Sequence, residues 1–135
     1  MASRAYLHRV ARRRTTGILL GATLLTSAVH FVDNAFRLDL YPGPVGLTRN
    51  HVLLAWLVLP ALAWLSYWRA TRVALTAYGV LGFAGLAHYL VPHRHVIPLR
   101  CAVTIFGEAV ASAALVAYVL SRDCFEPPHR LPDQR

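Results

Sequence analysis

The sequence predicts an all-α integral membrane protein, an antiparallel bundle of four helices with both termini in the cytoplasm. Hydrophobic residues make up 56% of the 135 residues and charged residues 15%, below the roughly 25% charged content of soluble globular proteins. The apolar residues also gather into four runs of at least 17 residues, near the ~20 needed to cross a bilayer. We therefore expect a multi-pass protein of the cell membrane whose first partner is the lipid bilayer.

The four runs define the expected segments of the chain. Residues 1–16 are expected to be a basic cytoplasmic leader, and the proline-rich residues 121–135 a disordered cytoplasmic tail. Residues 17–120 between them form the predicted transmembrane domain. Its expected spans are residues 17–38, 51–67, 73–91 and 101–120.

The first run also fits a secretory signal peptide, which would be removed from the mature protein. Its apolar core would be GILLGATLL, and Thr26, Ser27 and Ala28 would form the cleavage site. Retention as a transmembrane helix is the favoured interpretation, because the apolar helix continues through Phe36 and three more runs follow.

Arginine placement sets the expected orientation. Every one of the 14 basic residues is an arginine, and the net charge is +8. Ten of these arginines fall on the side of the N-terminus and four on the other side, which predicts cytoplasmic termini by the positive-inside rule. Nucleic acid is not an expected partner, since the arginines sit at segment ends and form no continuous basic face.

Polar residues in the first span recur at gaps of three and four, the spacing that places side chains on one face of a helix. A polar stripe on a helix that crosses a bilayer is costly unless it faces other protein, so it marks a candidate functional site. The stripe consists of Thr23, Thr26, Ser27, His30, Asp33, Asn34 and Arg37.

The predicted topology brings further ionisable residues to the same depth as this stripe. His88 ends the third run, and Glu108 lies two turns into the fourth run from the same side of the membrane. Histidine and carboxylate side chains suit zinc, copper or iron. The leading hypothesis is thus a divalent transition-metal site opening outward, with second contacts from Asn34 and Ser112. Its expected ligands are His30, Asp33, His88 and Glu108.

Two other functions fit the same residues. In the first, the bundle holds a pocket for a small lipophilic ligand, and Glu108 or Asp33 moves a proton or pairs with a ligand cation. This pocket is expected to be reached sideways from lipid between the glycine-rich third helix and the fourth helix. Gly79, Gly82 and Gly85 themselves are interpreted as positions where another helix packs closely. In the second, the polar residues form a structural interhelical network, with Asp33 paired to Arg37 four residues later. Whether the protein is an enzyme or a homo-oligomer stays open.

The middle of the chain resembles the EXPERA-type membrane proteins, which include sterol isomerases and sigma-2-receptor-like proteins. The resembling features are Asp33 followed by Leu40–Pro42, Leu59 with Pro60, and the segment around His88. The resemblance implies four helices around a pocket for a sterol-like or cationic lipophilic ligand, with Asp33 as a ligand-binding carboxylate. This chain departs from that pattern because its second run contains no acidic residue.

Overall fold

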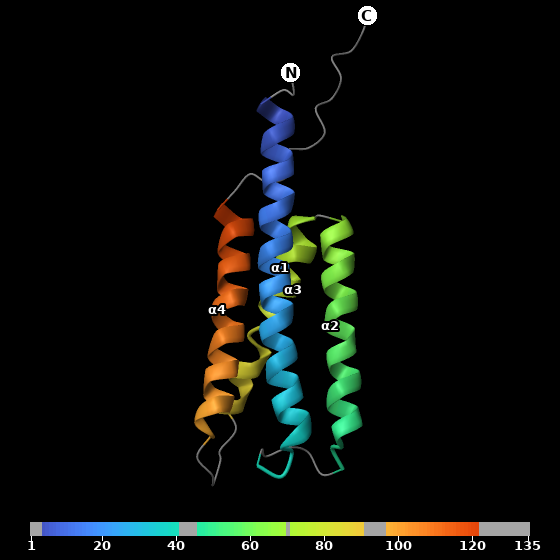
Figure 1. The fold of residues 1–135 in the computed structure, drawn as a ribbon, viewed down its shortest axis with the longest axis vertical. Coiled ribbons are helices and arrows are strands. Elements are labelled where there is room, and N and C mark those ends of the chain that lie inside the picture. The colour runs from blue at the N-terminus through green and yellow to red at the C-terminus, as the bar shows by residue number, and fades with distance from the viewer. Residues whose placement is uncertain (1–3, 41–45, 70, 91–96, 122–135) are drawn as a thin grey trace, which may run out of the picture.

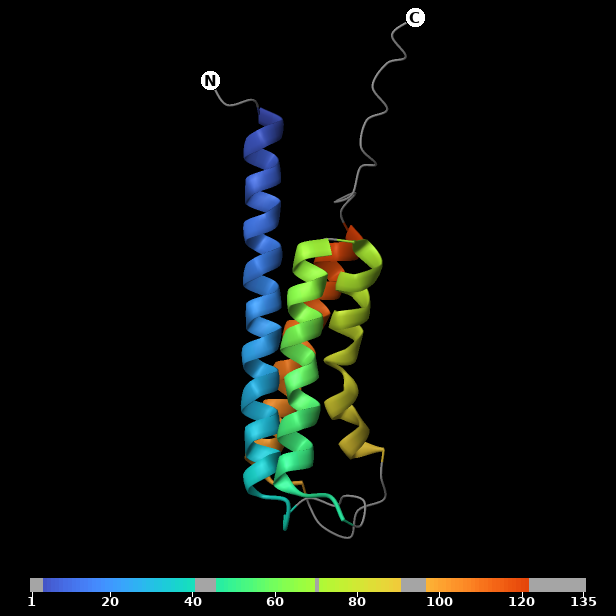
Figure 2. The same cartoon turned by 90° about the vertical axis from the view of Figure 1, so that its right-hand side faces the viewer.

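The computed structural model describes residues 4–40, 46–69, 71–90 and 97–121 (Figures 1 and 2). These residues form helices joined by short connections and contain no β-strand, which confirms the predicted all-α class. The helices lie side by side along one common axis, and η1 continues in the direction of α3 (Figures 1 and 2). In chain order the elements are α1 (Arg4–Phe36), α2 (Arg49–Arg69), α3 (Arg72–Leu81), the 3₁₀ helix η1 (Ala84–Tyr89) and α4 (Leu99–Ser121).

Three helices are long and apolar enough to cross a bilayer, which agrees with a polytopic membrane protein. They are Val10–Phe36 within α1, the 21-residue α2 and the 23-residue α4. At about 1.5 Å of rise per residue, each is at least as long as the roughly 30 Å hydrocarbon core. The helix α1 begins at Arg4, so its basic first turns continue the first predicted span without a break and project beyond the other helices (Figure 2).

The outer surface of this bundle carries many large apolar side chains, as expected where the surrounding solvent is lipid. Leu25, Leu54 and Phe106, for example, are more than 60% exposed. Inside, the helices bury an apolar core around Leu75 and Leu115 and also enclose a set of polar side chains. Three members of the predicted stripe on α1 are among them, which confirms that this stripe faces protein. The buried polar residues are Thr23, Ser27, His30, Ser66, Glu108 and Ser112.

The third predicted span differs from the other three. Its α-helix ends after ten residues at Leu81, and the chain continues as η1. The change begins at Gly82, whose amide donates to the carbonyl of Gly79, and Phe83 repeats the same three-residue pattern with Val80. Hydrogen bonds three residues apart define a 3₁₀ helix, which rises about 2 Å per residue and is narrower than an α-helix.

Close contact between α3 and α4 accounts for two glycines in this region. A Cβ atom on Gly79 would lie 2.6 Å from Val116 Cγ2, and one on Gly82 would lie 2.9 Å from Ser112 Cβ. Side chains larger than hydrogen do not fit at these positions. The interpretation of both glycines as helix-packing positions is therefore confirmed, with α4 as the neighbour.

The start of α3 is fixed by a side-chain cap. Thr71 lies just before the helix and its hydroxyl oxygen accepts a hydrogen bond from the amide of Ala74 at 3.2 Å. We expect Thr71→Ala to lower the free energy of unfolding by about 1 kcal/mol, the usual cost of removing such a cap. Reversible unfolding in mixed micelles would measure the change. Thr71→Ser, which keeps the hydroxyl, is the control, and equal losses in the two variants would contradict the capping role.

Candidate ligand-binding site

A histidine and a glutamate from opposite ends of the sequence meet inside the bundle. His30 of α1 and Glu108 of α4 are 2% and 3% exposed. The Nδ1 atom of His30 lies 2.6 Å from Oε2 of Glu108, the length of a strong charge-assisted hydrogen bond. The two helices pack directly against each other, and the pair joins α1 to α4. The predicted juxtaposition of these two residues is therefore present in the structure.

Asn34 completes a chain of hydrogen bonds on the other side of the imidazole. It follows His30 by one helical turn, and its Nδ2 lies 3.0 Å from His30 Nε2. The thiol of Cys101 on α4 lies 3.9 Å from the amide oxygen of Asn34, a weak contact in which the thiol donates. With the amide in this orientation, Asn34 donates to Nε2 of His30, and Nδ1 of the imidazole faces Glu108 as its hydrogen-bond donor. The imidazole therefore links an amide on one side to a carboxyl group on the other.

Gly85 lets the backbone of η1 lie directly over this pair. A Cβ atom on Gly85 would lie 2.7 Å from His30 Cε1 and 3.4 Å from Glu108 Oε2. In Figure 2, η1 and α1 lie on opposite sides of the bundle, with α2 and α4 between them. His30 thus spans the interior from α1 to η1, and only glycine at position 85 leaves space for its ring.

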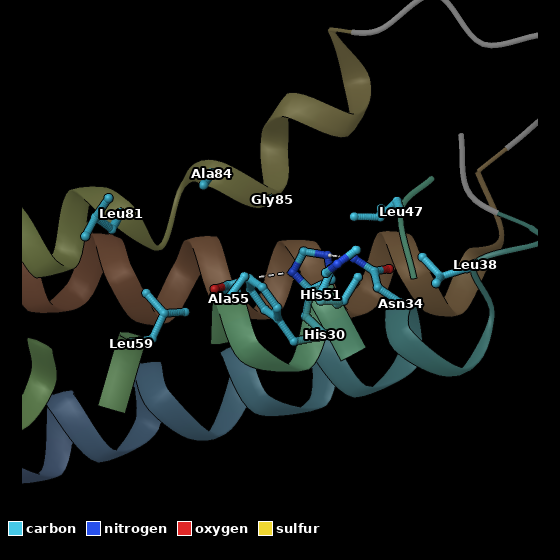
Figure 3. Close-up of a pocket in the computed structure, with 13 residues that line it drawn as sticks. His30, Asn34, Leu38, Leu47, His51, Ala55, Leu59, Leu81, Ala84 and Gly85 are labelled. Atoms are coloured by element: carbon cyan, nitrogen blue, oxygen red, sulfur yellow. Dashed lines mark hydrogen bonds and ion pairs between the residues drawn. The ribbon is translucent and has the colours of Figure 1, made fainter. Parts of the chain in front are cut away.

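The pair forms part of the wall of a cavity of about 330 Å³. That volume is within the range of sites that bind small molecules, roughly 300–1,000 Å³. Figure 3 shows Ala84 and Gly85 of η1 across from Ala55 and Leu59 of α2, with Leu38 and Leu47 at the end away from Leu81. Four polar side chains line the cavity, and the rest of the lining is apolar. The four are His30, Asn34, His51 and Glu108.

His51 lies at the end of the cavity where α2 begins. Its amide donates to Thr48 Oγ1 at 3.3 Å, and the amide of Thr48 donates to His51 Nδ1 at 3.3 Å. These reciprocal bonds cap the first turn of α2. His51 is thus a residue of the first turn of α2, and it also borders the cavity.

Asp33 takes part in a different interaction. Its Oδ1 lies 3.1 Å from Nε of Arg37, four residues later on α1, and 3.8 Å from Nε of Arg100 on α4. Asp33 is not among the described residues that line the cavity. The ion pair with Arg37 considered from the sequence is therefore observed, and Asp33 contacts these arginines without lining the cavity.

The four predicted metal ligands are not assembled by the part of the chain that the structure describes. Only His30 and Glu108 come together, and the described residues contain no group of three His, Cys, Asp or Glu side chains able to hold a metal ion. The side chain of His88 lies outside the described residues, as do His93 and His95. Of the two expected second contacts, Asn34 bonds to His30, whereas Ser112 packs under Gly82 and its Oγ has no partner among the described residues. The geometry does not support the metal hypothesis.

The position of the cavity also corrects the expected entrance. An opening between the third and fourth helices was predicted, but α3 packs on α4 through Gly79 and Gly82. The cavity lies instead between α2 and the segment from Leu81 to Gly85, with α1 as its floor. Glu108 is the one described residue of α4 that reaches it.

Comparison with known proteins identifies no relative of this chain. The chain matches no protein-family model, no curated protein and no solved structure. The resemblance to EXPERA-type proteins therefore stays a prediction from the sequence. The functional inference that follows depends on the geometry of the cavity alone.

Proposed function

We propose that this protein is a polytopic membrane protein whose cavity binds a small lipophilic amine. The observation that carries the proposal is the buried His30–Glu108 pair in the wall of an otherwise apolar cavity. Apolar walls with a few converging polar groups are typical of small-molecule sites, where the walls accommodate the body of the ligand and the polar groups fix its orientation.

The charge of the pair favours a cation as its ligand. In the proposed state the imidazole is neutral and Glu108 is ionised, so that Asn34 donates to Nε2 of His30, and His30 hydrogen-bonds the carboxylate without neutralising it. A buried charge without a counter-charge is costly in apolar surroundings. An ammonium group in the cavity would supply the counter-charge, while the apolar remainder of the molecule would contact side chains such as Leu59 and Leu81.

Proton transfer to a lipophilic substrate is the second candidate function, and the 2.6 Å contact favours it. Two groups that exchange one proton over this distance can act as base and acid in turn. With one proton on the pair, Glu108 would add that proton to one carbon of an alkene substrate and then remove a proton from another carbon, while His30 stays hydrogen-bonded to the carboxyl group. The double bond would move with no net gain or loss of atoms or electrons. Incorporation of deuterium from heavy water into a bound alkene would distinguish this activity from binding alone.

For the topology, we propose four crossings with cytoplasmic termini. The third crossing would be made by α3 and η1 together, because the larger rise of a 3₁₀ helix extends the segment from Arg72 to Tyr89 to roughly 30 Å. Arg13 at one end of the bundle and Arg72, which donates to the last turn of α4 at Leu120, fit the cytoplasmic side. Fluorescence of a green fluorescent protein fused to the C-terminus would support this orientation, and its absence would count against it.

The binding proposal is tested with 4-phenylbutylamine and the matched alcohol 4-phenylbutanol. Thermal unfolding of the protein in lipid nanodiscs would be followed with each compound. We expect the amine to stabilise the wild type more than the alcohol, because only the amine carries a charge. Glu108→Gln should weaken amine binding at least tenfold, in line with the roughly 1.5–3 kcal/mol of a hydrogen bond to a charged group.

Asp33→Asn is the matched control for Glu108→Gln. Both substitutions replace a carboxylate with an amide, but Asp33 pairs with Arg37 and does not line the cavity. Amine binding should survive in Asp33→Asn. The glutamine of Glu108→Gln can still accept the Nδ1–H of His30, so the variant should fold. Equal stabilisation by amine and alcohol, or unchanged amine binding in Glu108→Gln, would overturn the proposal.

A further inference from the structure

A second hollow lies on the outer surface of the bundle, at the end opposite the His30–Glu108 pair. It is a groove of about 350 Å³ between α1 and α2. Its outward position is shown by Trp64, which lines it and is 65% exposed. The lining residues are Gly17, Leu20, Gly21, Leu24, Pro60, Ala63, Trp64 and Tyr67.

Two glycines shape this groove in different ways. A Cβ on Gly17 would lie 3.4 Å from the ring of Tyr67, so the aromatic side chain packs over this position. A Cβ on Gly21, one turn deeper, would meet nothing within 4 Å. The two helices are therefore in contact at the level of Gly17 and leave open space at the level of Gly21.

Positive charge borders the end of the groove that is nearer the N-terminus. Arg13 and Arg14 precede Gly17 by four and three residues, which places them on the same face of α1 as the two glycines. At 1.5 Å of rise per residue they lie about 5–6 Å beyond Gly17. The guanidinium carbon of Arg13 lies 5.2 Å from the centre of the Tyr67 ring and 5.6 Å from that of Trp68. These cation–π contacts hold a charge at the mouth of the groove.

We infer that this groove binds one anionic phospholipid from the leaflet at the N-terminal end of α1. An acyl chain would lie along Gly21 and Leu24, where the groove is apolar and open. The phosphate would lie beside Arg13 and Arg14, because guanidinium groups form strong charge-assisted bonds with phosphate oxygens. Basic pockets next to membrane helices are typical sites for anionic headgroups.

The charges favour a lipid over a second copy of the chain. A symmetric dimer through this groove would place the same face of α1 from both copies at one interface. It would then bring Arg13 and Arg14 of each copy toward those of the other, and like charges in close contact repel. An anionic headgroup meets the same arginines with the opposite charge. A dimer is thus the competing outcome that the experiment must distinguish.

The test is native mass spectrometry of the detergent-solubilised protein with added dioleoylphosphatidylglycerol or dioleoylphosphatidylcholine. We expect one tightly held phosphatidylglycerol and weaker binding of phosphatidylcholine. The double variant Arg13→Gln/Arg14→Gln should bind phosphatidylglycerol about thirtyfold more weakly, from the typical contribution of two arginines to anionic-lipid binding. Arg49→Gln removes an arginine at the other end of the bundle, where Arg49 lies over the ring of Phe36, and should leave binding unchanged.

Filling the groove tests the acyl-chain part of the inference. Gly21→Leu inserts a side chain where the structure has open space, so the fold should be kept while bound lipid is lost. Ala61→Leu, which adds bulk at an exposed position of α2 outside the groove lining, is the control. Equal binding of the two lipids would overturn the inference, as would a protein dimer that Gly21→Leu dissociates. If Gly21→Leu fails to fold, the arginine double variant decides.

Discussion

Gly82→Ala is expected to lower the free energy of unfolding by about 2 kcal/mol, within the 1–3 kcal/mol range of an overpacked interior. The backbone itself accepts alanine, because Gly82 has a φ of −67°. The cost comes from Ser112 on α4, whose Cβ would lie 2.9 Å from the new methyl group and whose Oγ would overlap it. Rotation of Ser112 can move the hydroxyl but not the Cβ. The clash therefore persists unless α3 and α4 separate.

A compensating substitution identifies the source of this loss. Ser112→Gly removes both atoms that the new methyl group would meet, so the double variant Gly82→Ala/Ser112→Gly should be more stable than Gly82→Ala alone. Gly21→Ala is the control, since a Cβ at that position meets nothing within 4 Å. Reversible unfolding of the wild type and these three variants in mixed micelles would measure the changes. Wild-type stability in Gly82→Ala would show that α3 and α4 do not pack this closely.

The spacing of the glycines in the third segment is compatible both with close helix packing and with a 3₁₀ helix. Gly79, Gly82 and Gly85 recur at intervals of three, a spacing interpreted as close packing of a continuous helix. Two of them do pack on α4, as predicted. Side chains three residues apart are eclipsed in a 3₁₀ helix. The interval was therefore also a signal for the η1 conformation, which places Gly85 over His30.

The partnership of His30 and Glu108 was predictable because depth in a membrane helix follows from counting residues. The rotation of each side chain about the helix axis is harder to predict. Asp33 and Asn34 are three and four residues after His30, so both belong to its face. The structure turns Asn34 toward the imidazole and Asp33 toward Arg37 and Arg100. Asp33 contacts two arginines, and one of them, Arg100, comes from a distant part of the sequence. This contact could not be predicted by counting residues along α1.

The boundaries of the helices were predictable to different degrees for a related reason. Long apolar runs predicted α1, α2 and α4, because a bilayer requires a continuous apolar helix of fixed length. The same requirement gave no information about how far α1 continues outside the apolar run. Its basic residues from Arg4 onward, within the segment expected to be a basic leader, are helical and continuous with the span. Arginine has a high helix propensity, which is consistent with this continuation.

His30→Leu should destabilise the protein by about 3 kcal/mol, the upper part of the range for leaving a buried polar group without its hydrogen-bond partner. Glu108 is 3% exposed and would lose the hydrogen bond from Nδ1 of His30 with no water to replace it. Glu108→Met should cost about 1–3 kcal/mol, because it leaves the buried Nδ1–H of His30 without an acceptor. Both variants keep most of the original side-chain volume, so the loss would come from the broken interaction.

The double variant His30→Leu/Glu108→Met separates the stability of the pair from its proposed function. Replacing a buried polar pair with apolar residues of similar volume is often neutral or stabilising, so the double variant should be more stable than His30→Leu. Asn34 would lose one hydrogen-bond partner in this variant, so a small loss in the free energy of unfolding should remain. If the stability loss of the double variant equals the sum of the losses of the two single variants, the two residues are not coupled. If the double variant folds but no longer binds 4-phenylbutylamine, the pair is retained in this protein for ligand recognition, because the bundle is then stable without it.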